Sequence, residues 1–229
     1  MKIAIIGAME VEIKHLREAL ENRQEKQIHQ FQFYTGTIGH HEVVVLLSGV
    51  GKVSAAVSTT LLIDHFAPDL VINTGTAGGL RNVAVKDIIL ATGVKHHDVD
   101  LTAFGYQLGQ PSQMPPAFIP DAYFLEKAQA IITQHQLSAN QGLIVSGDAF
   151  INQPEKFEWI KQAFPEAKAV EMEAAAIAQV CHQMRTPFII LRAISDIAGE
   201  GNAVSFETFV AEAGKRSAEI NIALIKSLD

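Results

Sequence analysis

The residues most able to do chemistry in this sequence are carboxylates that stand at predicted strand ends. Glu171 ends a short strand expected from Lys168, and Glu173 lies at the start of an alanine-rich segment, Ala174–Met184, that predicts a helix. Asp196 follows an unbroken apolar run, which is typical of a strand buried on both faces. Because ligands bind at the carboxyl ends of strands in open α/β sheets, we expect Glu173 and Asp196 to meet in one crevice.

A third acid, Glu12, occupies the same kind of position near the other end of the chain. Gly7 ends the first predicted strand, so Met9 and Glu12 lie on the first turn of the following helix. An acid at a helix start is often only a cap or a partner of the helix dipole, and this alternative holds for each acid taken alone. Acids at three strand ends instead favour glycosidic bond cleavage, in which one acid protonates the leaving group and another activates water.

The order of hydrophobic patterns predicts strands that alternate with helices, which indicates a largely parallel sheet covered on both faces. Strands are expected at Lys2–Gly7, Gln32–Ile38, Glu42–Leu47, Leu70–Thr74, Asp87–Val94, Gly142–Ser146, Lys168–Glu171 and Phe188–Ile194. Helices are expected at Glu10–Glu21, Lys52–Phe66, Asp121–Gln136, Glu155–Phe164, Ala174–Met184 and Glu207–Leu228. The second and third strands are close enough to form an antiparallel hairpin. We therefore predict a three-layer α/β fold with a central mixed, mostly parallel sheet flanked by helices.

Length and composition limit the class of protein. The chain has 229 residues, 48% hydrophobic and 19% charged, and no composition shift divides it, so a single domain over residues 1–229 is expected. The first apolar run is too short for a secretory signal, and no segment approaches the ~20 apolar residues of a membrane span. A formal net charge of −7 disfavours nucleic acid as a partner. The one cysteine, Cys181, is expected in the core of a cytoplasmic protein.

Glycine-rich turns follow predicted strands at Ser48–Lys52 and Asn73–Leu80. The first lacks the third glycine of a dinucleotide fingerprint, and Val53 replaces the Ser or Thr of a P-loop. For this first turn a purely structural role and a ligand contact stay open, whereas the second is expected to contact a ligand through its backbone. His96–Asp100 lacks the ligand spacing of a zinc site, so no metal is expected. The pair His40-His41 is expected in a solvated turn.

The segment Lys95 to Pro120 fits neither a helix nor a strand pattern, because glycines and prolines interrupt it. A loop of this length in a compact domain is usually functional or part of an interface. Its apolar side chains need something to cover them, and we expect a partner subunit to do so. These side chains are Leu101, Phe104, Tyr106, Met114 and Phe118.

With these residues in place, the chain resembles the 5′-methylthioadenosine/S-adenosylhomocysteine nucleosidase family, within the purine nucleoside phosphorylase-like fold. The resemblance covers essentially the whole chain. Its most specific segments are Ile6–Glu10 with Glu12, Ser48–Lys52, Asn73–Leu80, Asp98–Tyr106, Val145–Ile151, Val170–Ala174 and Arg192–Asp196. Matches in this order make coincidence implausible.

The resemblance implies a division of labour among the acids. Asp196 would protonate N7 of an adenine leaving group, and Glu12 would deprotonate the attacking water; general acid catalysis of this kind typically contributes ~10²–10⁴-fold. Glu173 would accept hydrogen bonds from the ribose 2′- and 3′-hydroxyls, with Met172 against the sugar. Such bonds strengthen as positive charge develops on the sugar. No cofactor is implied, and the substrates would be adenine nucleoside thioethers.

The resemblance also implies the walls of the substrate site. The positions are Phe150, Ile151, Ser195 and Ala198 around adenine; Met9, Val50 and Phe206 around the 5′-alkylthio group; and Thr76, Ala77 and Gly78 near the nucleophile. Leu101 and Phe104 match loop positions that reach into the neighbouring subunit's site, which implies a homodimer. Thr76 replaces a more familiar serine, and Lys86 replaces a glycine in an expected exposed turn. The prolines between Pro111 and Pro116 depart from the family pattern, which leaves the shape of the 5′ pocket open.

Hydrolysis and phosphorolysis both occur on this fold, and the nucleophile distinguishes them. Phosphate needs arginines or other cationic donors, whereas Glu10 and Glu12 follow the first strand here and no arginine precedes Arg17. Water is therefore the expected nucleophile. The alternatives are a nucleoside phosphorylase, a non-catalytic nucleoside-binding domain, and a hydrolase of aminodeoxyfutalosine, whose adenine and ribose would make the same contacts.

Overall fold

A nine-stranded sheet forms the centre of the described part of the chain. The computed structural model describes the backbone of residues 1–198 and 203–228, and the side chains of residues 1–198 and 209–228. The strands are β1 (Lys2–Gly7), β2 (Glu21–Ile28), β3 (Phe31–Ile38), β4 (His41–Leu47), β5 (Leu70–Gly79), β6 (Ile88–His96), β7 (Ala139–Ser146), β8 (Ala167–Glu171) and β9 (Phe188–Ile197). The helices are α1 (Glu10–Glu18), α2 (Lys52–Phe66), α3 (Ala122–Gln134), α4 (Pro154–Ala163), α5 (Ala174–Met184) and α6 (Ala203–Ser227), with a short 3₁₀ turn at Thr102–Phe104.

The strand order makes the sheet mixed, as predicted. It is β2-β3-β4-β1-β5-β8-β7-β6-β9, and β9 also pairs with β5, so the last five strands close into a ring. β1 runs parallel to β4 and β5, and β5 runs parallel to β9. The predicted hairpin of β3 and β4 is confirmed, and β6 pairs antiparallel with β9. This arrangement brings the carboxyl ends of β1, β5 and β9 to one edge of the sheet.

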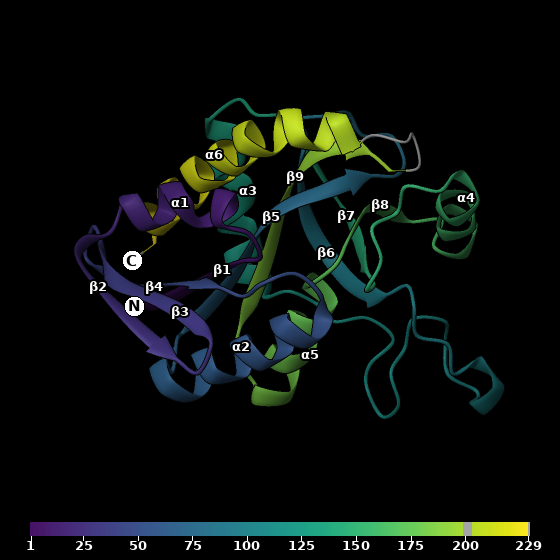
Figure 1. Ribbon diagram of the computed structural model, residues 1–229, viewed down its shortest axis with the longest axis horizontal. Helices are drawn as coiled ribbons and strands as arrows, with labels where there is room; N and C mark the ends of the chain where they lie inside the picture. The colour runs from purple at the N-terminus through teal and green to yellow at the C-terminus, as the bar shows by residue number, and fades with distance from the viewer. Residues whose placement is uncertain (199–202, 229) are drawn as a thin grey trace.

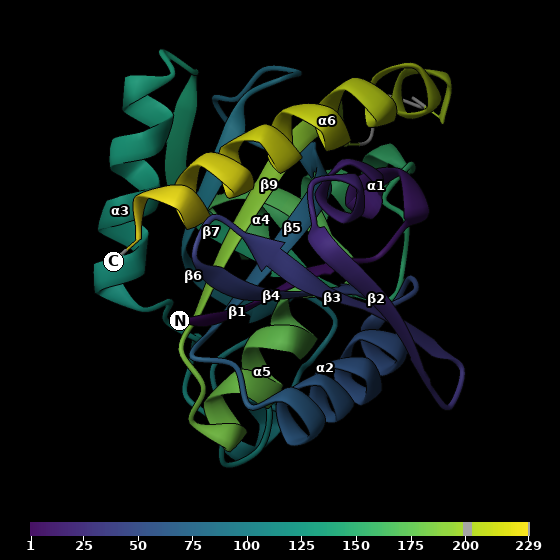
Figure 2. The ribbon, with the colours of Figure 1, turned by 90° about the vertical axis from the view of Figure 1, so that its left-hand side faces the viewer.

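Helices cover both faces of the sheet (Figure 1). α1, α3 and α6 lie on one side and α2 and α5 on the other, which the perpendicular view also shows (Figure 2). Alternate residues of β1 face the two sides: Ile5 packs in the core with Leu224 of α6, and Ile6 in the core with Ile177 of α5. Because both faces are buried, the central strands are mainly apolar, with polar exceptions such as Asn73 of β5 and Arg192 of β9. None of the helices in the described residues combines the length and apolar composition needed to cross a membrane.

Several element boundaries differ from the sequence-based prediction. β2 is not predicted, because every residue of it except Ile28 is exposed and no alternation of apolar residues marks it. As an edge strand, β2 is held by its backbone pairing with β3. α1 consequently ends at Glu18 rather than Glu21. β5 and β9 run further than predicted because they continue through the glycine-rich segment and through Ser195-Asp196.

The solvated turn expected at His40-His41 is wrong for His41. This residue begins β4, is fully buried, and its Nε2 lies 3.0 Å from the carbonyl oxygen of Leu228 near the end of the described chain. Lys86 does lie in an exposed turn, with a φ of 80° that glycine would adopt more easily. Cys181 is buried in α5, as expected, and burial raises the pKa of its thiol to about 12.

Gly214 allows α6 to lie directly against α1. A Cβ atom at this position would lie 2.8 Å from the carbonyl oxygen of Val11 and 3.5 Å from the Cα of Glu12. The backbone oxygen cannot move aside as a flexible side chain could. The close approach therefore fixes the helix that carries Glu12 against the longest helix of the fold.

We expect Gly214→Ala to destabilise the protein by about 1–3 kcal/mol, because the added methyl group must push the two helices apart. Alanine in a free helix would instead be favoured over glycine by about 1 kcal/mol. The free energy of unfolding, measured by denaturant titration, checks the sign. Ala211→Gly on the exposed face of the same helix is the control and should cost about 1 kcal/mol. A stabilised G214A variant would contradict the close packing.

Candidate active site

A cavity of about 180 Å³ opens at the carboxyl ends of β1, β5, β8 and β9. Its position follows from the topology, since β1, β5 and β9 run parallel and end at one edge of the sheet. The last residues of β8 meet the end of β5 in an antiparallel pairing. The lining residues are Ala8, Met9, Glu12, Val50, Thr76, Ala77, Gly78, Phe150, Val170, Glu171, Met172, Glu173, Arg192, Ser195 and Asp196. Residues from opposite ends of the chain therefore share one small space.

Glu12 is held in this cavity by four hydrogen bonds. Its Oε2 accepts from the backbone N–H groups of Ala8 at 2.9 Å and Met9 at 3.0 Å, which caps the start of α1. Its Oε1 accepts from Thr76, at 2.8 Å from the backbone nitrogen and 3.1 Å from the hydroxyl. Glu12 thus fills the capping role proposed as its alternative, and it also lines the cavity. The two functions are compatible because the capping bonds fix the orientation of the carboxylate.

Arg192 supplies the cation of the site and is 1% exposed. Its Nη2 donates to Asn73 Oδ1 at 2.8 Å and contacts the carboxylate of Glu171, and its Nη1 donates to the Thr76 carbonyl at 3.3 Å. Glu173 Oε2 lies 3.5 Å from the same Nη2. Of the residues lining the cavity, Arg192 is the only one with a cationic side chain. One guanidinium therefore balances several acids.

Gly75 allows Arg192 and Glu12 to approach the same stretch of β5. A Cβ atom on Gly75 would lie 2.5 Å from Arg192 Nη1 and 2.6 Å from Glu12 Oε1. The residue also has a φ of 151°, which other residues rarely adopt. A side chain here would displace both charged groups, so the site requires glycine at this position of β5.

Glu171 turns inward and supports the start of α5. Its carboxylate accepts hydrogen bonds from the backbone N–H groups of Glu173 at 3.0 Å and Ala174 at 2.9 Å, and from the hydroxyl of Ser146. An anion at a helix N-terminus is favoured by the free N–H groups and by the helix dipole. Glu171 is thus both part of the turn and the main partner of Arg192.

Glu173 is buried beside Glu171 and faces the cavity. Its Oε1 accepts a hydrogen bond of 2.9 Å from the backbone nitrogen of Gly51, which ties the glycine-rich turn after β4 to the start of α5. Burial and the nearby carboxylate of Glu171 raise the pKa of Glu173 to about 7. Its charge therefore changes within the neutral pH range.

Asp196 is the second-last residue of β9 and is buried at the cavity wall. The hydroxyl of Ser195 donates to its Oδ1 at 2.7 Å and fixes the orientation of the carboxyl group. Burial raises the pKa of Asp196 above its usual range. A carboxyl group that holds its proton more tightly than usual is suited to act as an acid.

Most of the residues assigned to the site from sequence line this one cavity. They are Met9, Glu12, Val50, Thr76, Ala77, Gly78, Phe150, Met172, Glu173, Ser195 and Asp196. Ile151 and Ala198 are buried behind the wall, and Ile151 borders a neighbouring hollow against α4 instead. Leu101 and Phe104 lie in the long loop and do not line the cavity of their own chain. The Phe206 side chain lies outside the described residues.

The sequence-based assignment left out Ala8, Val170 and Arg192, and it gave Glu171 no role toward the site. The two apolar residues carry no chemical signal. Arg192 does, because a charged residue inside an otherwise apolar strand must find buried partners. That observation alone could have placed Arg192 beside the acids.

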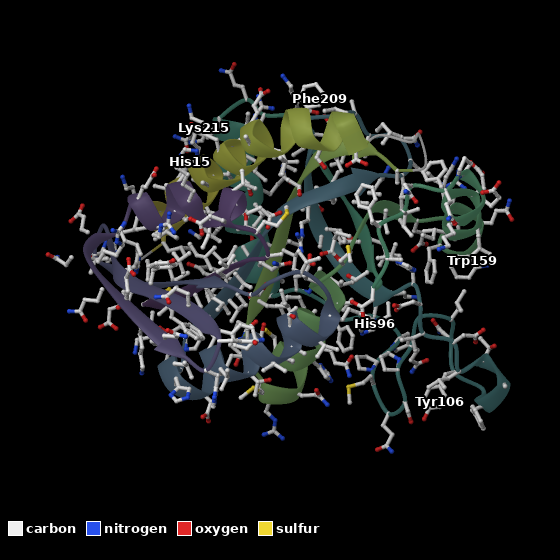
Figure 3. The ribbon with its side chains drawn as sticks, in the orientation of Figure 1. His15, His96, Tyr106, Trp159, Phe209 and Lys215 are labelled. Atoms are coloured by element: carbon white, nitrogen blue, oxygen red, sulfur yellow. The ribbon has the colours of Figure 1, made fainter. Side chains whose placement is uncertain are left out.

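His96, the last residue of β6, and the nearby Asp98 make contacts that support the structure around the cavity. His96 Nε2 lies 3.0 Å from Gln179 Oε1 of α5, in the region labelled in Figure 3. Asp98 pairs with Lys52 at 2.5 Å and accepts from the backbone nitrogen of Asp148 at 3.0 Å. These contacts tie the loops after β4, β6 and β7 together. Among the residues with described side chains, no group of three or more His, Cys, Asp and Glu could hold a metal ion.

Comparisons with known proteins agree with this geometry. The model of the phosphorylase superfamily matches residues 2–226. The chain is 49% identical to the 5′-methylthioadenosine/S-adenosylhomocysteine nucleosidase of Shewanella piezotolerans over the full length of both chains. It is 50% identical to the enzyme of the same name from Staphylococcus carnosus, with 99% of this chain and all of the relative covered.

Solved structures give the same result. The nucleosidase of the same name from Neisseria meningitidis, in complex with methylthio-immucillin-A, superposes with a TM-score of 0.97 at 48% identity over 99% of each chain. A futalosine hydrolase mutant of Helicobacter pylori superposes with a TM-score of 0.95, at 30% identity over the whole of both chains. The chain therefore belongs to the 5′-methylthioadenosine/S-adenosylhomocysteine nucleosidase family of the phosphorylase superfamily.

Proposed function

We propose that this protein hydrolyses the N-glycosidic bond of 5′-methylthioadenosine and S-adenosylhomocysteine, and also of 5′-deoxyadenosine, to release adenine and the 5′-substituted ribose. The observation that carries the proposal is that Glu12, Glu173 and Asp196 line one cavity together with a single, charge-balanced arginine. Two relatives that bear this name are 49% and 50% identical, against 30% for the futalosine hydrolase, which favours the thioether substrates.

Asp196 acts as the general acid. It donates its proton to N7 of adenine as the bond between C1′ and N9 breaks, so that the base leaves as a neutral molecule. Burial raises the pKa of Asp196, and the Ser195 hydroxyl holds the carboxyl group in one orientation. The raised pKa favours the protonated acid, whereas the hydrogen bond from Ser195 by itself lowers the pKa and serves to orient the group.

Glu12 acts as the general base toward water. The oxygen of the water attacks C1′, and one of its protons passes to the carboxylate of Glu12. The four hydrogen bonds from Ala8, Met9 and Thr76 hold this carboxylate without a rearrangement during the reaction. The proton released to Glu12 and the proton supplied by Asp196 balance the hydrolysis.

Glu173 binds the ribose in its charged form, because a carboxylate accepts hydrogen bonds from two hydroxyl groups. Its negative charge also stabilises the positive charge that develops on the sugar as the base leaves. With a pKa of about 7, Glu173 loses its proton as the pH rises through neutrality. Substrate binding and kcat/KM should therefore rise with pH on the acidic side of the profile.

The nucleophile is water because the described lining of the cavity offers no free cation to a phosphate ion. Arg192 is already in contact with Glu171 and lies close to Glu173. A Cβ atom on Gly75 would contact Glu12 Oε1 as well as Arg192 Nη1, so Glu12 adds a further negative charge on the same side of β5. A phosphate dianion would have to displace one of these carboxylates, which electrostatic repulsion opposes.

Adenine release should be independent of phosphate. The purified protein, freed of phosphate, is incubated with 5′-methylthioadenosine in the presence and absence of added phosphate, and adenine is measured by chromatography. We expect equal rates and a free 5-methylthioribose product. A strict need for phosphate, with a ribose 1-phosphate product, would refute hydrolysis, and binding without turnover would indicate a non-catalytic nucleoside-binding domain.

The two assigned acids should respond to isosteric substitution. Asp196→Asn and Glu12→Gln keep the shape of the site and remove the proton transfer, so each should lower kcat by roughly 10²–10⁴-fold. Glu10→Gln is the matched control, because Glu10 is on the same helix turn but pairs with Arg17 at the surface. Steady-state assays with 5′-methylthioadenosine decide the matter. Near-normal turnover of either site variant would refute the role given to that residue.

The protein is proposed to work as a homodimer in which Leu101 and Phe104 complete the neighbouring site. The loop that carries them projects from the body of the molecule, as the position of Tyr106 in Figure 3 illustrates. Phe104 is 78% exposed, and Val53 of α2 is 74% exposed. Apolar side chains that are so exposed support an interface with a second copy. We propose a cytoplasmic location, consistent with a buried, unpaired Cys181.

Subunit mixing tests this exchange. Phe104→Ala should lower kcat/KM by about tenfold through the loss of one wall of the partner's pocket. When this variant is mixed with inactive Asp196→Asn chains, mixed dimers should contain one complete site, and the activity should exceed the sum of the two parents. No gain after verified subunit exchange, or sedimentation as a single chain, would contradict the proposal.

A further inference from the structure

Glu171 is a buried acid that takes no direct part in the proposed chemistry. Its Oε2 accepts from the backbone nitrogens of Glu173 at 3.0 Å and Ala174 at 2.9 Å, and it also contacts the guanidinium of Arg192. Its Oε1 accepts from the hydroxyl of Ser146. Both oxygens of the carboxylate thus accept hydrogen bonds, and two of the residues that it holds, Glu173 and Arg192, line the substrate cavity.

Ser146 fixes the direction of this carboxylate. The two residues lie side by side in the register of β7 and β8. The Ser146 oxygen accepts a hydrogen bond of 2.8 Å from the backbone nitrogen of Ala175, so its own hydrogen is free to point toward Glu171. Glutamine at position 171 would keep the size of the side chain but would place a donor against other donors.

We infer that Glu171 is a positioning residue for the reaction: oriented by Ser146, it holds the Arg192 guanidinium and the first turn of α5, from which Glu173 reaches the ribose. This role rests on the proposed function. Arg192 in turn is fixed by Asn73 at 2.8 Å and the Thr76 carbonyl at 3.3 Å, and Thr76 binds Glu12. A displacement of Glu171 would therefore also displace Glu173, which binds the sugar, and Thr76, which holds the base Glu12.

The charge of Glu171 also acts on Glu173. The charged groups around Glu173 come from several elements: Glu171 of β8, Arg192 and Asp196 of β9, Glu12 of α1, and Lys52 next to the Gly51 that donates to it. After burial, Glu171 is the largest cause of the raised pKa of Glu173. Removing that charge should allow Glu173 to ionise at lower pH.

The test compares pH profiles of kcat and kcat/KM for the wild type and three variants with 5′-methylthioadenosine. In Glu171→Gln, we expect kcat to fall by about 10–100-fold through misplacement of the site groups. The acidic limb of kcat/KM should move to lower pH by about one unit. Ser146→Ala removes the hydrogen bond that orients Glu171 but keeps the charge of Glu171. We therefore expect kcat to fall while the acidic limb of kcat/KM stays at the same pH. Glu158→Gln, which removes an exposed acid paired with Lys161 on α4, is the control and should change neither.

The outcomes separate positioning from a general structural role. A lower kcat in E171Q with an unmoved acidic limb, or no change at all, would overturn the inference. If E171Q does not fold, Glu171→Asp takes its place, because it keeps the charge and withdraws the carboxylate by one methylene. For this variant kcat should fall while the acidic limb of kcat/KM stays at the same pH. Wild-type kinetics would overturn the inference. An inactive wild type would refute the proposed function itself, whereas an active wild type with unchanged variants would refute only the role of Glu171.

Discussion

The site depends on one buried interaction, the contact of the Arg192 guanidinium with the carboxylates around it. Glu12, Glu171, Glu173 and Asp196 are all buried at the same edge of the sheet. Moving an ionised carboxylate out of water costs several kcal/mol unless opposite charge and hydrogen bonds replace the lost hydration. Arg192 provides the only opposite charge lining the described cavity. Breaking such a buried pair typically costs about 3–5 kcal/mol, so the geometry of the acids and the stability of this edge are linked.

The fold provides the remaining compensation through its backbone. Glu12, Glu171 and Glu173 lie where a strand gives way to a turn or a helix, and free N–H groups are available there. Glu12 takes those at the start of α1, Glu171 those at the start of α5, and Glu173 the one at Gly51. Gly75 completes the arrangement because it has no side chain to separate Arg192 from Glu12. The same strand ends that build the core thus create a small cavity with a dense set of fixed charges.

The sequence predicts those features that depend on local pattern. The apolar runs of the central strands show where the apolar part of each strand ends, and Glu12, Glu173 and Asp196 follow these runs, although β5 and β9 continue beyond them. The partners of Arg192 cannot be read in this way, because Asn73, Thr76 and Glu171 lie far from it in the chain and meet it only through the pairing of β5 with β8 and β9.

Other features are hidden for different physical reasons. β2 is stabilised by backbone pairing at the edge of the sheet and carries almost no apolar side chains, so hydrophobic periodicity cannot detect it. His41 looks like part of a polar turn, and its burial depends on the residues near the end of α6 that cover it. The surroundings of Leu101 and Phe104 depend on a second chain in our proposal, and no pattern within one sequence fixes such a contact.

The source of the oxygen atom that is added to the anomeric carbon tests most directly the claim that Arg192 is neutralised by carboxylates and that water is the nucleophile. The reaction is run with 5′-methylthioadenosine in water enriched in the heavy isotope of oxygen, with ordinary phosphate present, and the sugar product is analysed by mass spectrometry before exchange at its anomeric carbon. If the nearby carboxylates neutralise the charge of Arg192, the sugar should carry one heavy oxygen at that carbon in nearly every molecule. A phosphorylated sugar without the heavy isotope at the anomeric carbon would show that phosphate reaches the site and would contradict this explanation of hydrolysis.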